Sequence, residues 1–249
     1  MEGPSLFLAQ EQLQPFCGKE VLRVSGTDKL DHALFLHKNI CDIFSWGKHL
    51  VFQFDTFGLR VHFMLFGTFR AEVEGKTYTG DYAPTGEPKL VFEFENGRFE
   101  MYNCSLKILD GEHVMQYYDF SVDVMSKKWN PLEALRQVEM MCDQEISDVL
   151  LNQDIFAGVG NVIRNEALWL NKILPTKKVR QLSTQQLQAL IETVGDYAKK
   201  FYEWRKTDSV HDHDNVYRKQ HCPGCGTEIL RQQTGKAKRW SYICPTCQT

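Results

Sequence analysis

Apolar and polar residues alternate through much of the first 125 residues, and this period of two predicts β-strands. Four such runs cover 50–54, 59–65, 90–94 and 99–104, and Leu65 is the last apolar residue of the second run. Asn96-Gly97 between the last two runs is a strong hairpin signal, and residues 84–88 are typical of a loop. Successive hairpins that share one apolar face predict an antiparallel β-sandwich or barrel.

The period changes at Asn130-Pro131, where a capping residue precedes a proline suited to the first helical position. Apolar residues then recur at helical spacing, which predicts helices over about 131–141, 145–152 and 161–171. Ser183-Thr184-Gln185-Gln186 is a capping box that opens a further helix. We therefore expect an all-helical second domain over residues 126–210.

The turn before the third of these helices contains Gly158-Val159-Gly160-Asn161, within residues 154–166. Glycine permits positive φ values and close approach, and Asn161 is suited to cap the helix that it starts. Backbone N–H groups at such a helix start attract anions. A plain helix-turn-helix connection explains the same residues equally well.

Length and composition narrow the class of protein. At 249 residues and 43% hydrophobic content, the chain can bury a sizeable core in one or two domains. No apolar run approaches the ~20 residues that span a bilayer, and no segment resembles a signal peptide. We therefore expect a cytoplasmic protein with no membrane partner.

Charge is distributed unevenly along the chain. Residues 1–159 hold 14 Lys and Arg against 24 Asp and Glu, a net of −10, whereas residues 160–249 hold 15 against 8, a net of +7. A basic half suits a polyanionic partner. Mutual attraction between the two halves accounts for the same asymmetry.

Four of the eight cysteines form two Cys-x-x-Cys pairs, Cys222 with Cys225 and Cys244 with Cys247. Pairs at this separation place four thiolates around Zn²⁺, so we expect a four-cysteine zinc ribbon with one structural zinc ion per chain. Two redox disulfides are the alternative. The scattered cysteines are expected to be core residues: Cys17, Cys41, Cys104 and Cys142.

The residues between the cysteine pairs predict a hairpin, with Ile229-Leu230 on one strand and Trp240 and Tyr242 on the other. Its tip carries three cations that suit phosphates or a nucleic-acid groove, and a solvated loop is the alternative: Lys236, Lys238 and Arg239. Residues 206–215 are polar and predict a linker, whose two histidines and three aspartates lack the fixed spacing of a metal site.

In this order, the features resemble the formamidopyrimidine-DNA glycosylase and endonuclease VIII family of base-excision repair enzymes. The resemblance rests on Glu2-Gly3-Pro4, on Gly47-Lys48 before a strand, on Gly158-Val159-Gly160-Asn161, and on the last segment, Cys244-Pro245-Thr246-Cys247-Gln248. It covers essentially the whole chain. It implies an α+β multidomain protein with an N-terminal antiparallel β-sandwich catalytic domain (1–125), a helix-two-turn-helix DNA-binding domain (126–210) and a C-terminal four-cysteine zinc finger (216–249).

The resemblance also implies roles for single residues. Glu2 is expected to be the general acid, and Lys48 to hold a phosphate near the lesion and assist catalysis. Asn161 and Arg239 are expected to bind the DNA backbone at the lesion.

Three further residues occupy the strand end where the family inserts side chains into the base stack: Met64, Leu65 and Phe66. Leu65 also continues an apolar alternation, so a core position is the alternative for it. This triplet, and the short stretch between the last helix and the finger, resemble the endonuclease VIII side of the family. Oxidised pyrimidines are the substrates that this resemblance implies.

The nucleophile departs from the family pattern, which uses an N-terminal proline. This chain reads Met1-Glu2-Gly3-Pro4, so the α-amine of Met1 falls directly before the glutamate. An α-amino group has a reference pKa of about 7.7–8.0, against about 10.4 for a lysine, and keeps a neutral fraction able to form a Schiff base. We expect the Met1 amine to be the nucleophile, although Ser5, at a position often occupied by glutamate, leaves its deprotonation unexplained.

The implied function is a bifunctional DNA glycosylase and AP lyase, acting by β,δ-elimination on damaged double-stranded DNA. A monomer is sufficient for this activity, and the protein would be nucleoid-associated if bacterial. One alternative is a non-catalytic damaged-DNA-binding homologue, and another is a zinc-ribbon adaptor for protein partners. Glu2 favours the enzyme because a protein that only binds DNA has no need of a general acid.

Overall fold

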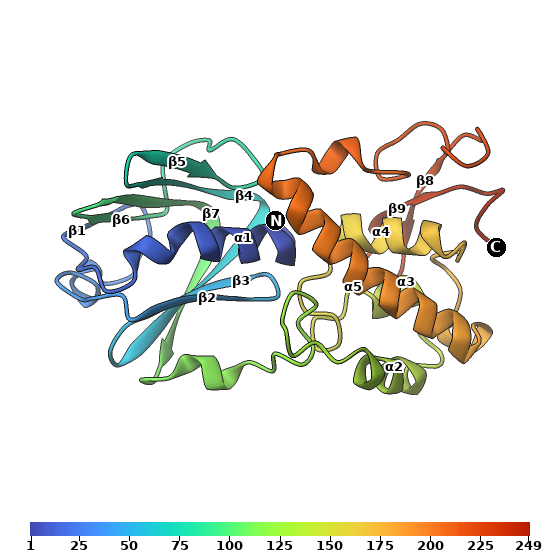
Figure 1. Cartoon of the computed structure of the whole chain (residues 1–249), viewed down its shortest axis with the longest axis horizontal. Coiled ribbons are helices and arrows are strands. Elements are labelled where there is room, and N and C mark those ends of the chain that lie inside the picture. The colour runs from blue at the N-terminus through green and yellow to red at the C-terminus, as the bar shows by residue number, and fades with distance from the viewer. The chain divides into compact units, whose positions relative to one another are not determined.

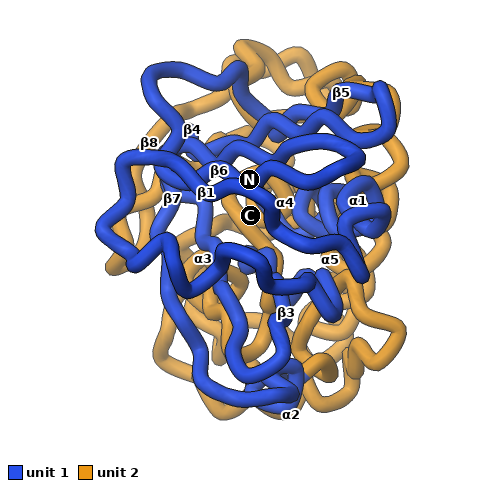
Figure 2. Tube along the Cα trace, turned by 90° about the vertical axis from the view of Figure 1, so that its left-hand side faces the viewer, with its two compact units in different colours: residues 1–119 blue, residues 120–249 orange.

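The computed structural model describes all residues, 1–249, and the chain forms two compact units, residues 1–119 and residues 120–249 (Figures 1 and 2). The helical segment and the four-cysteine hairpin lie in the same unit. The division into three domains at 1–125, 126–210 and 216–249 stays a prediction. No helix is both long enough and apolar enough to cross a membrane.

The first unit is built on one antiparallel sheet of seven strands in the order β1-β6-β7-β4-β3-β2, with β5 paired to β4. The strands are β1 (Arg23–Ser25), β2 (Asp42–Trp46), β3 (His49–Gln53), β4 (Phe57–Val73), β5 (Lys76–Thr79), β6 (Leu90–Phe94) and β7 (Gly97–Asp110). All four predicted strand runs lie in β3, β4, β6 and β7, although Phe54 falls one residue beyond β3. The antiparallel architecture predicted from the alternation is therefore confirmed.

The two layers of the predicted sandwich are halves of one sheet that share its two longest strands. The first part of β4 pairs with β3, whereas its last residues pair with β5, and β7 pairs with β4 along almost its whole length. The register between β4 and β7 shifts between Phe63 and Thr68. This irregularity separates the two halves and frees the residues inside it from the ladder.

Aromatic rings from both halves meet in the core of this unit. Phe52 of β3 lies 5.3 Å from Phe99 of β7 and 6.2 Å from Phe92 of β6, measured between ring centroids. The N-terminal helix α1 (Gly3–Leu13) adds Leu6, Ala9 and Leu13 to the same core. In Figure 1, α1 runs between β2–β3 and the other strands.

Helix α1 was not expected from the alternation. Its apolar residues recur at positions 6, 9 and 13, a helical spacing, and Pro4 lies in its first turn, where proline is tolerated. The residue before the helix, Glu2, caps it with no side-chain hydrogen bond, so the capping signal found at Asn130 and Ser183 is missing here.

The second unit contains helices α2 (Pro131–Met140), α3 (Ile146–Val149), α4 (Asn161–Leu170) and α5 (Thr184–Lys206), and the hairpin of β8 (Leu230–Thr234) and β9 (Arg239–Ile243). Asn130 caps α2 by accepting the N–H of Glu133, and Ser183 and Gln186 form the predicted capping box of α5. Helix α3 is shorter than the predicted 145–152, because the N–H groups of Leu151 and Asn152 bond to carbonyls three residues back and tighten the chain into turns. Short 3₁₀ turns cover Gln14–Phe16, His32–Leu34, Val114–Tyr117, Val179–Gln181 and Val210–Asp212.

Candidate functional site

The first residue is fixed by its own side chain. The Met1 side chain is 0% exposed and packs against the core of the first unit. Its Sδ is so near Gly80 that a Cβ built on this glycine would lie 3.0 Å from the sulfur. The α-amine lies 3.8 Å from Oδ2 of Asp81. The amine is therefore held at a defined place beside a carboxylate.

Glu2 is the N-cap residue of α1, and it is buried. Its carbonyl accepts the N–H groups of Ser5 and Leu6, at 3.1 and 3.3 Å, and its side chain makes no capping bond. Ser5 is also buried, and its Oγ has no hydrogen-bond partner. The helix start thus fixes the backbone of Glu2 directly after the amine.

Lys48 lies in the two-residue turn that joins β2 to β3, after Gly47, whose φ of 54° is easily reached by glycine. A ring nitrogen of His62 on β4 lies 3.2 Å from the Lys48 carbonyl. Burial lowers the pKa of His62, and the charges of Lys48, Arg60 and the N-terminal amine lower it further. Met1, Lys48 and His62 are thus brought together at one end of these strands.

The sequence motifs did not single out His62, although its pairing with His49 across β3 and β4 was within reach of the strand pattern. Burial first, and then the charges of Arg60, His62 and Lys48, lower the pKa of His49 from 6.5 to about 4. Both imidazoles are therefore largely neutral at neutral pH, beside two cations.

Met64, Leu65 and Phe66 form an exposed apolar bulge inside β4, at its register shift. Leu65 is 69% exposed, so the alternative of a core position for it was wrong: the alternation ends at Phe63. Phe66 has a φ of 62°, and Asn103 of β7 donates its Nδ2 to the Leu65 carbonyl at 2.7 Å. The bulge thus turns three apolar side chains outward.

The glycine-rich turn of the second unit places Asn161 as the first residue of α4. The N-cap is Gly160, in extended conformation, and no side chain caps the helix, so the expected capping role of Asn161 was wrong. The Asn161 Nδ2 instead donates to the carbonyl of Trp240, at 3.0 Å. Gly158 adopts a φ of 99°, which the turn requires.

The polar residues of α4 bind the four-cysteine hairpin. Arg164 donates its Nη2 to the Trp240 carbonyl and to Ser241 Oγ, both at 2.9 Å, and Asn165 Oδ1 accepts the N–H of Tyr242 at 2.8 Å. Asn161 and Arg239 are therefore brought close together, because Trp240 follows Arg239 directly.

Glu166 on the same helix is 0% exposed, and its carboxylate accepts four hydrogen bonds from the segment before the hairpin. The donors are the backbone N–H groups of Asn215, Val216 and Tyr217 and the Nδ2 of Asn215, at 2.8–2.9 Å. A buried carboxylate is tolerated only when its acceptor capacity is filled in this way.

The hairpin tip is held to α3 by acidic side chains. Glu145 accepts the N–H of Gly235 at 3.0 Å, and Asp148 accepts that of Lys236 at 2.8 Å. A Cβ on Gly235 would collide with the Asp148 carboxylate. The tip is thus no freely solvated loop, yet the side chains of Lys236, Lys238 and Arg239 are exposed.

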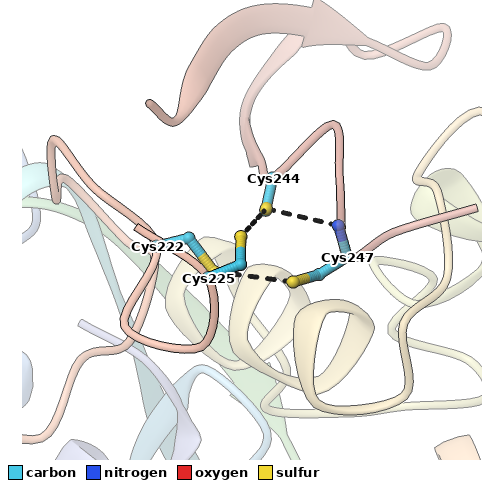
Figure 3. A group of neighbouring side chains, drawn as sticks. All are labelled: Cys222, Cys225, Cys244 and Cys247. Atoms are coloured by element: carbon cyan, nitrogen blue, oxygen red, sulfur yellow. Dashed lines mark hydrogen bonds between the residues drawn. The ribbon is translucent and has the colours of Figure 1, made fainter. Parts of the chain in front are cut away.

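The sulfur atoms of Cys222, Cys225, Cys244 and Cys247 lie within 4.8 Å of one another (Figure 3). Sulfur–sulfur distances of 3.4 Å for Cys225–Cys244 and 3.8 Å for Cys222–Cys247 are far above the ~2.05 Å of a disulfide, which excludes the redox-disulfide alternative in this structure. Tetrahedral Zn–S bonds of about 2.3 Å place sulfurs roughly 3.8 Å apart, so the cluster fits zinc. Trp169 of α4 donates its Nε1 to Cys222 Sγ at 3.3 Å.

Two other expectations need correction. Of the scattered cysteines only Cys104 is buried, while Cys41 and Cys142 are exposed and Cys17 is partly exposed. The 206–215 segment is packed rather than a plain linker: buried Asp214 lies 2.8 Å from the His211 ring, and the ring of His213 stacks on Trp204. The four cysteines are the one group that could hold a metal.

Comparison with known proteins identifies the class. Residues 122–209 match the family model described as the formamidopyrimidine-DNA glycosylase H2TH domain. The antiparallel sheet, this helical domain and the four-cysteine hairpin together define a glycosylase fold. The chain therefore contains an H2TH domain of the formamidopyrimidine-DNA glycosylase family, and it has endonuclease 8-like proteins among its relatives.

Endonuclease 8-like 3 of Mus musculus is 31% identical over 81% of this chain and 33% of its own length. Endonuclease 8-like 2 of Homo sapiens is 32% identical over 76% of this chain and 57% of its own length. The chain thus spans about a third to just over half of the length of these curated relatives. The structure of Lactococcus lactis formamidopyrimidine-DNA glycosylase bound non-covalently to DNA with an AP site shares the fold, with a TM-score of 0.83 over 100% of both chains at 22% identity.

Replacing the buried Glu166 by glutamine removes an acceptor where only N–H groups converge. We expect Glu166→Gln to lower the free energy of unfolding by about 2–4 kcal/mol in urea titrations, because a buried donor is left without a partner. Glu192→Gln on the exposed face of α5 is the control, expected to change it by less than about 0.5 kcal/mol. Equal effects of both substitutions would contradict the role of Glu166.

The low pKa of His49 predicts a pH dependence. Between about pH 6.5 and pH 4 the unfolded chain binds a proton at this residue and the folded chain does not, so stability falls as the pH drops through this window. We expect His49 to contribute a loss of about 2 kcal/mol between about pH 7 and pH 4.5. His49→Gln should flatten the pH profile of urea unfolding by that amount, whereas His113→Gln, at an exposed histidine, should leave it unchanged; identical profiles for all three proteins would refute the assignment.

Proposed function

We propose that this protein is a bifunctional DNA glycosylase and AP lyase that removes oxidised bases, preferably pyrimidines, through a Schiff base to its N-terminal amine. The observation that carries the proposal is the fixed amine of Met1, directly before a buried glutamate, in a chain of this family. The relatives named as endonuclease 8-like proteins support the reaction class.

Damaged double-stranded DNA is the proposed partner. Asn161 uses one Nδ2 hydrogen on the Trp240 carbonyl, and the second hydrogen of that amide suits a phosphate oxygen. Arg239 is exposed and one residue from the same carbonyl, so it extends this donor surface. The solved relative bound to AP-site DNA supports the same class of partner.

The exposed bulge of Met64, Leu65 and Phe66 is the proposed wedge. Extruding a nucleotide costs a few kcal/mol of stacking, and apolar side chains that fill the gap offset part of that cost. Three adjacent apolar side chains held outward by a bulge suit this role better than any core function. The preference for pyrimidines is proposed from this triplet and from the short, packed segment before the finger.

The chemistry divides among three groups of the first unit. The neutral Met1 amine attacks C1′ of the sugar, the bond to the base breaks, and Glu2 supplies a proton to the ring oxygen or the departing base. Lys48 holds a phosphate near the lesion. The resulting Schiff base acidifies the adjacent sugar carbon, which permits elimination of the 3′ and then the 5′ phosphate.

The four cysteines are proposed to hold one Zn²⁺. Four thiolate ligands leave no open position, so the metal is structural and stabilises the hairpin that carries Arg239. Zinc binding is then part of the folding energy of this segment.

The direct test is borohydride trapping on a thymine-glycol duplex. We expect a covalent complex with the wild type, and we expect Glu2→Gln to bind the duplex while losing base excision. Intact-mass measurement of the same preparation checks that Met1 is retained. Salt-sensitive binding without any trapped complex would favour the non-catalytic homologue instead, and the absence of salt-sensitive DNA binding would favour an adaptor.

Substitutions of Arg239 and Cys244 should separate an effect on DNA binding from an effect on folding of the hairpin. Arg239→Ala is expected to weaken DNA binding about tenfold or more with little change in melting temperature, because an exposed side chain is removed. Cys244→Ser is expected to lower the melting temperature and zinc content together. The division of roles fails if both substitutions destabilise the protein equally.

A further inference from the structure

The segment that carries Asp81 is fixed on both sides to β4. The N–H of Gly80 donates to the Phe69 carbonyl at 3.0 Å, and Thr68 Oγ1 donates to the Tyr82 carbonyl at 2.7 Å. Thr68 is itself buried. Asp81 therefore lies between two residues, Gly80 and Tyr82, that are both hydrogen-bonded to β4.

Met1 is seated against the same segment. A Cβ on Gly80 would lie 2.5 Å from Thr68 Oγ1 and 3.0 Å from Met1 Sδ, so a side chain at this position would collide with Thr68 and press on the methionine. With its side chain buried, Met1 presents its amine 3.8 Å from Asp81 Oδ2, and Asp81 is 21% exposed. Gly80, which adjoins the Met1 side chain, and Asp81, which lies beside the Met1 amine, are thus neighbours in the sequence.

The other titratable groups near this amine suit the role of proton acceptor less well. Lys48 is a cation, and burial together with the charges of Lys48 and Arg60 lowers the pKa of His62, which disfavours a proton on its ring. Glu2 follows the amine directly and is the proposed acid, which must hold its proton for the substrate. Asp81 is the carboxylate in ion-pair contact with the amine.

We propose that Asp81 accepts the proton of the Met1 amine and so prepares it for attack. This inference rests on the proposed function. The 3.8 Å separation exceeds a direct hydrogen bond, so the proton passes through one bridging water, which the partial exposure of Asp81 permits.

On an AP site the step balances without an external reagent. One N–H bond of the ammonium breaks and its proton goes to Asp81, and the freed lone pair forms the bond to the C1′ aldehyde. The aldehyde oxygen then takes one proton from nitrogen and one back from Asp81 and leaves as water. The product is the iminium ion, which borohydride reduces by hydride addition.

The test compares Asp81→Asn, Asp81→Glu and Asp110→Asn in single-turnover borohydride trapping on an AP-site duplex, which bypasses base excision. Asp110 is an exposed aspartate of the same unit and serves as the matched control. At neutral pH we expect Asp81→Asn to trap about 100-fold more slowly, Asp81→Glu to recover at least about tenfold of the loss, and Asp110→Asn to stay within about twofold of wild type. The defect of Asp81→Asn should narrow at alkaline pH, where hydroxide removes the proton.

Binding of each variant to a duplex with a tetrahydrofuran site should stay within about twofold of wild type, which separates proton transfer from DNA recognition. Wild-type trapping rates in Asp81→Asn, or a loss that neither pH nor glutamate restores, overturn the inference. If Asp81→Asn proves unfolded by melting, Asp81→Ser takes its place with the same expected outcomes. A wild type that binds DNA but never traps would instead defeat the proposed function itself.

Discussion

The buried carboxylate of Glu166 is the interaction on which the second unit depends. Four N–H groups converge on it from the segment before the hairpin, while Arg164 and Asn165 on the same helix bind Trp240, Ser241 and Tyr242. The hairpin has only a small core of its own. Helix α4 and the hairpin segment each supply hydrogen-bond partners for the buried polar groups of the other. Helix α4 and the hairpin therefore form one body, which fixes the spacing between Asn161 and Arg239, the proposed DNA contacts.

In the first unit, one polar group is likewise held in a fixed position. Here the fixed group is a nitrogen, and packing fixes it: the Met1 side chain fills space left by Gly80. A proline nucleophile is held by its ring, whereas a primary amine on a flexible residue needs an anchor. Burial of the methionine supplies such an anchor for the proposed nucleophile and leaves its amine beside Asp81.

Short-range patterns in the sequence, such as alternation, capping residues and cysteine spacing, predicted several features correctly. The strands around Phe52, Phe92 and Phe99, the cap at Asn130 and the four-cysteine cluster were all found in this way. Features set by tertiary contacts were harder to predict. The alternation extends to Leu65 in the sequence, but a bulge interrupts it in the structure. Asn161 does not cap its helix, because its side chain binds the Trp240 carbonyl. The contact between Met1 and Asp81 joins residues 80 positions apart in the chain, so no local signal contained it.

The central claim is that the α-amine of Met1, and no lysine, forms the Schiff base. Digestion of the borohydride-reduced complex, followed by tandem mass spectrometry, locates the sugar remnant on the protein. We predict that the remnant lies on the α-nitrogen of the N-terminal peptide that begins at Met1. A remnant on Lys48, or on any other side chain, would contradict this claim.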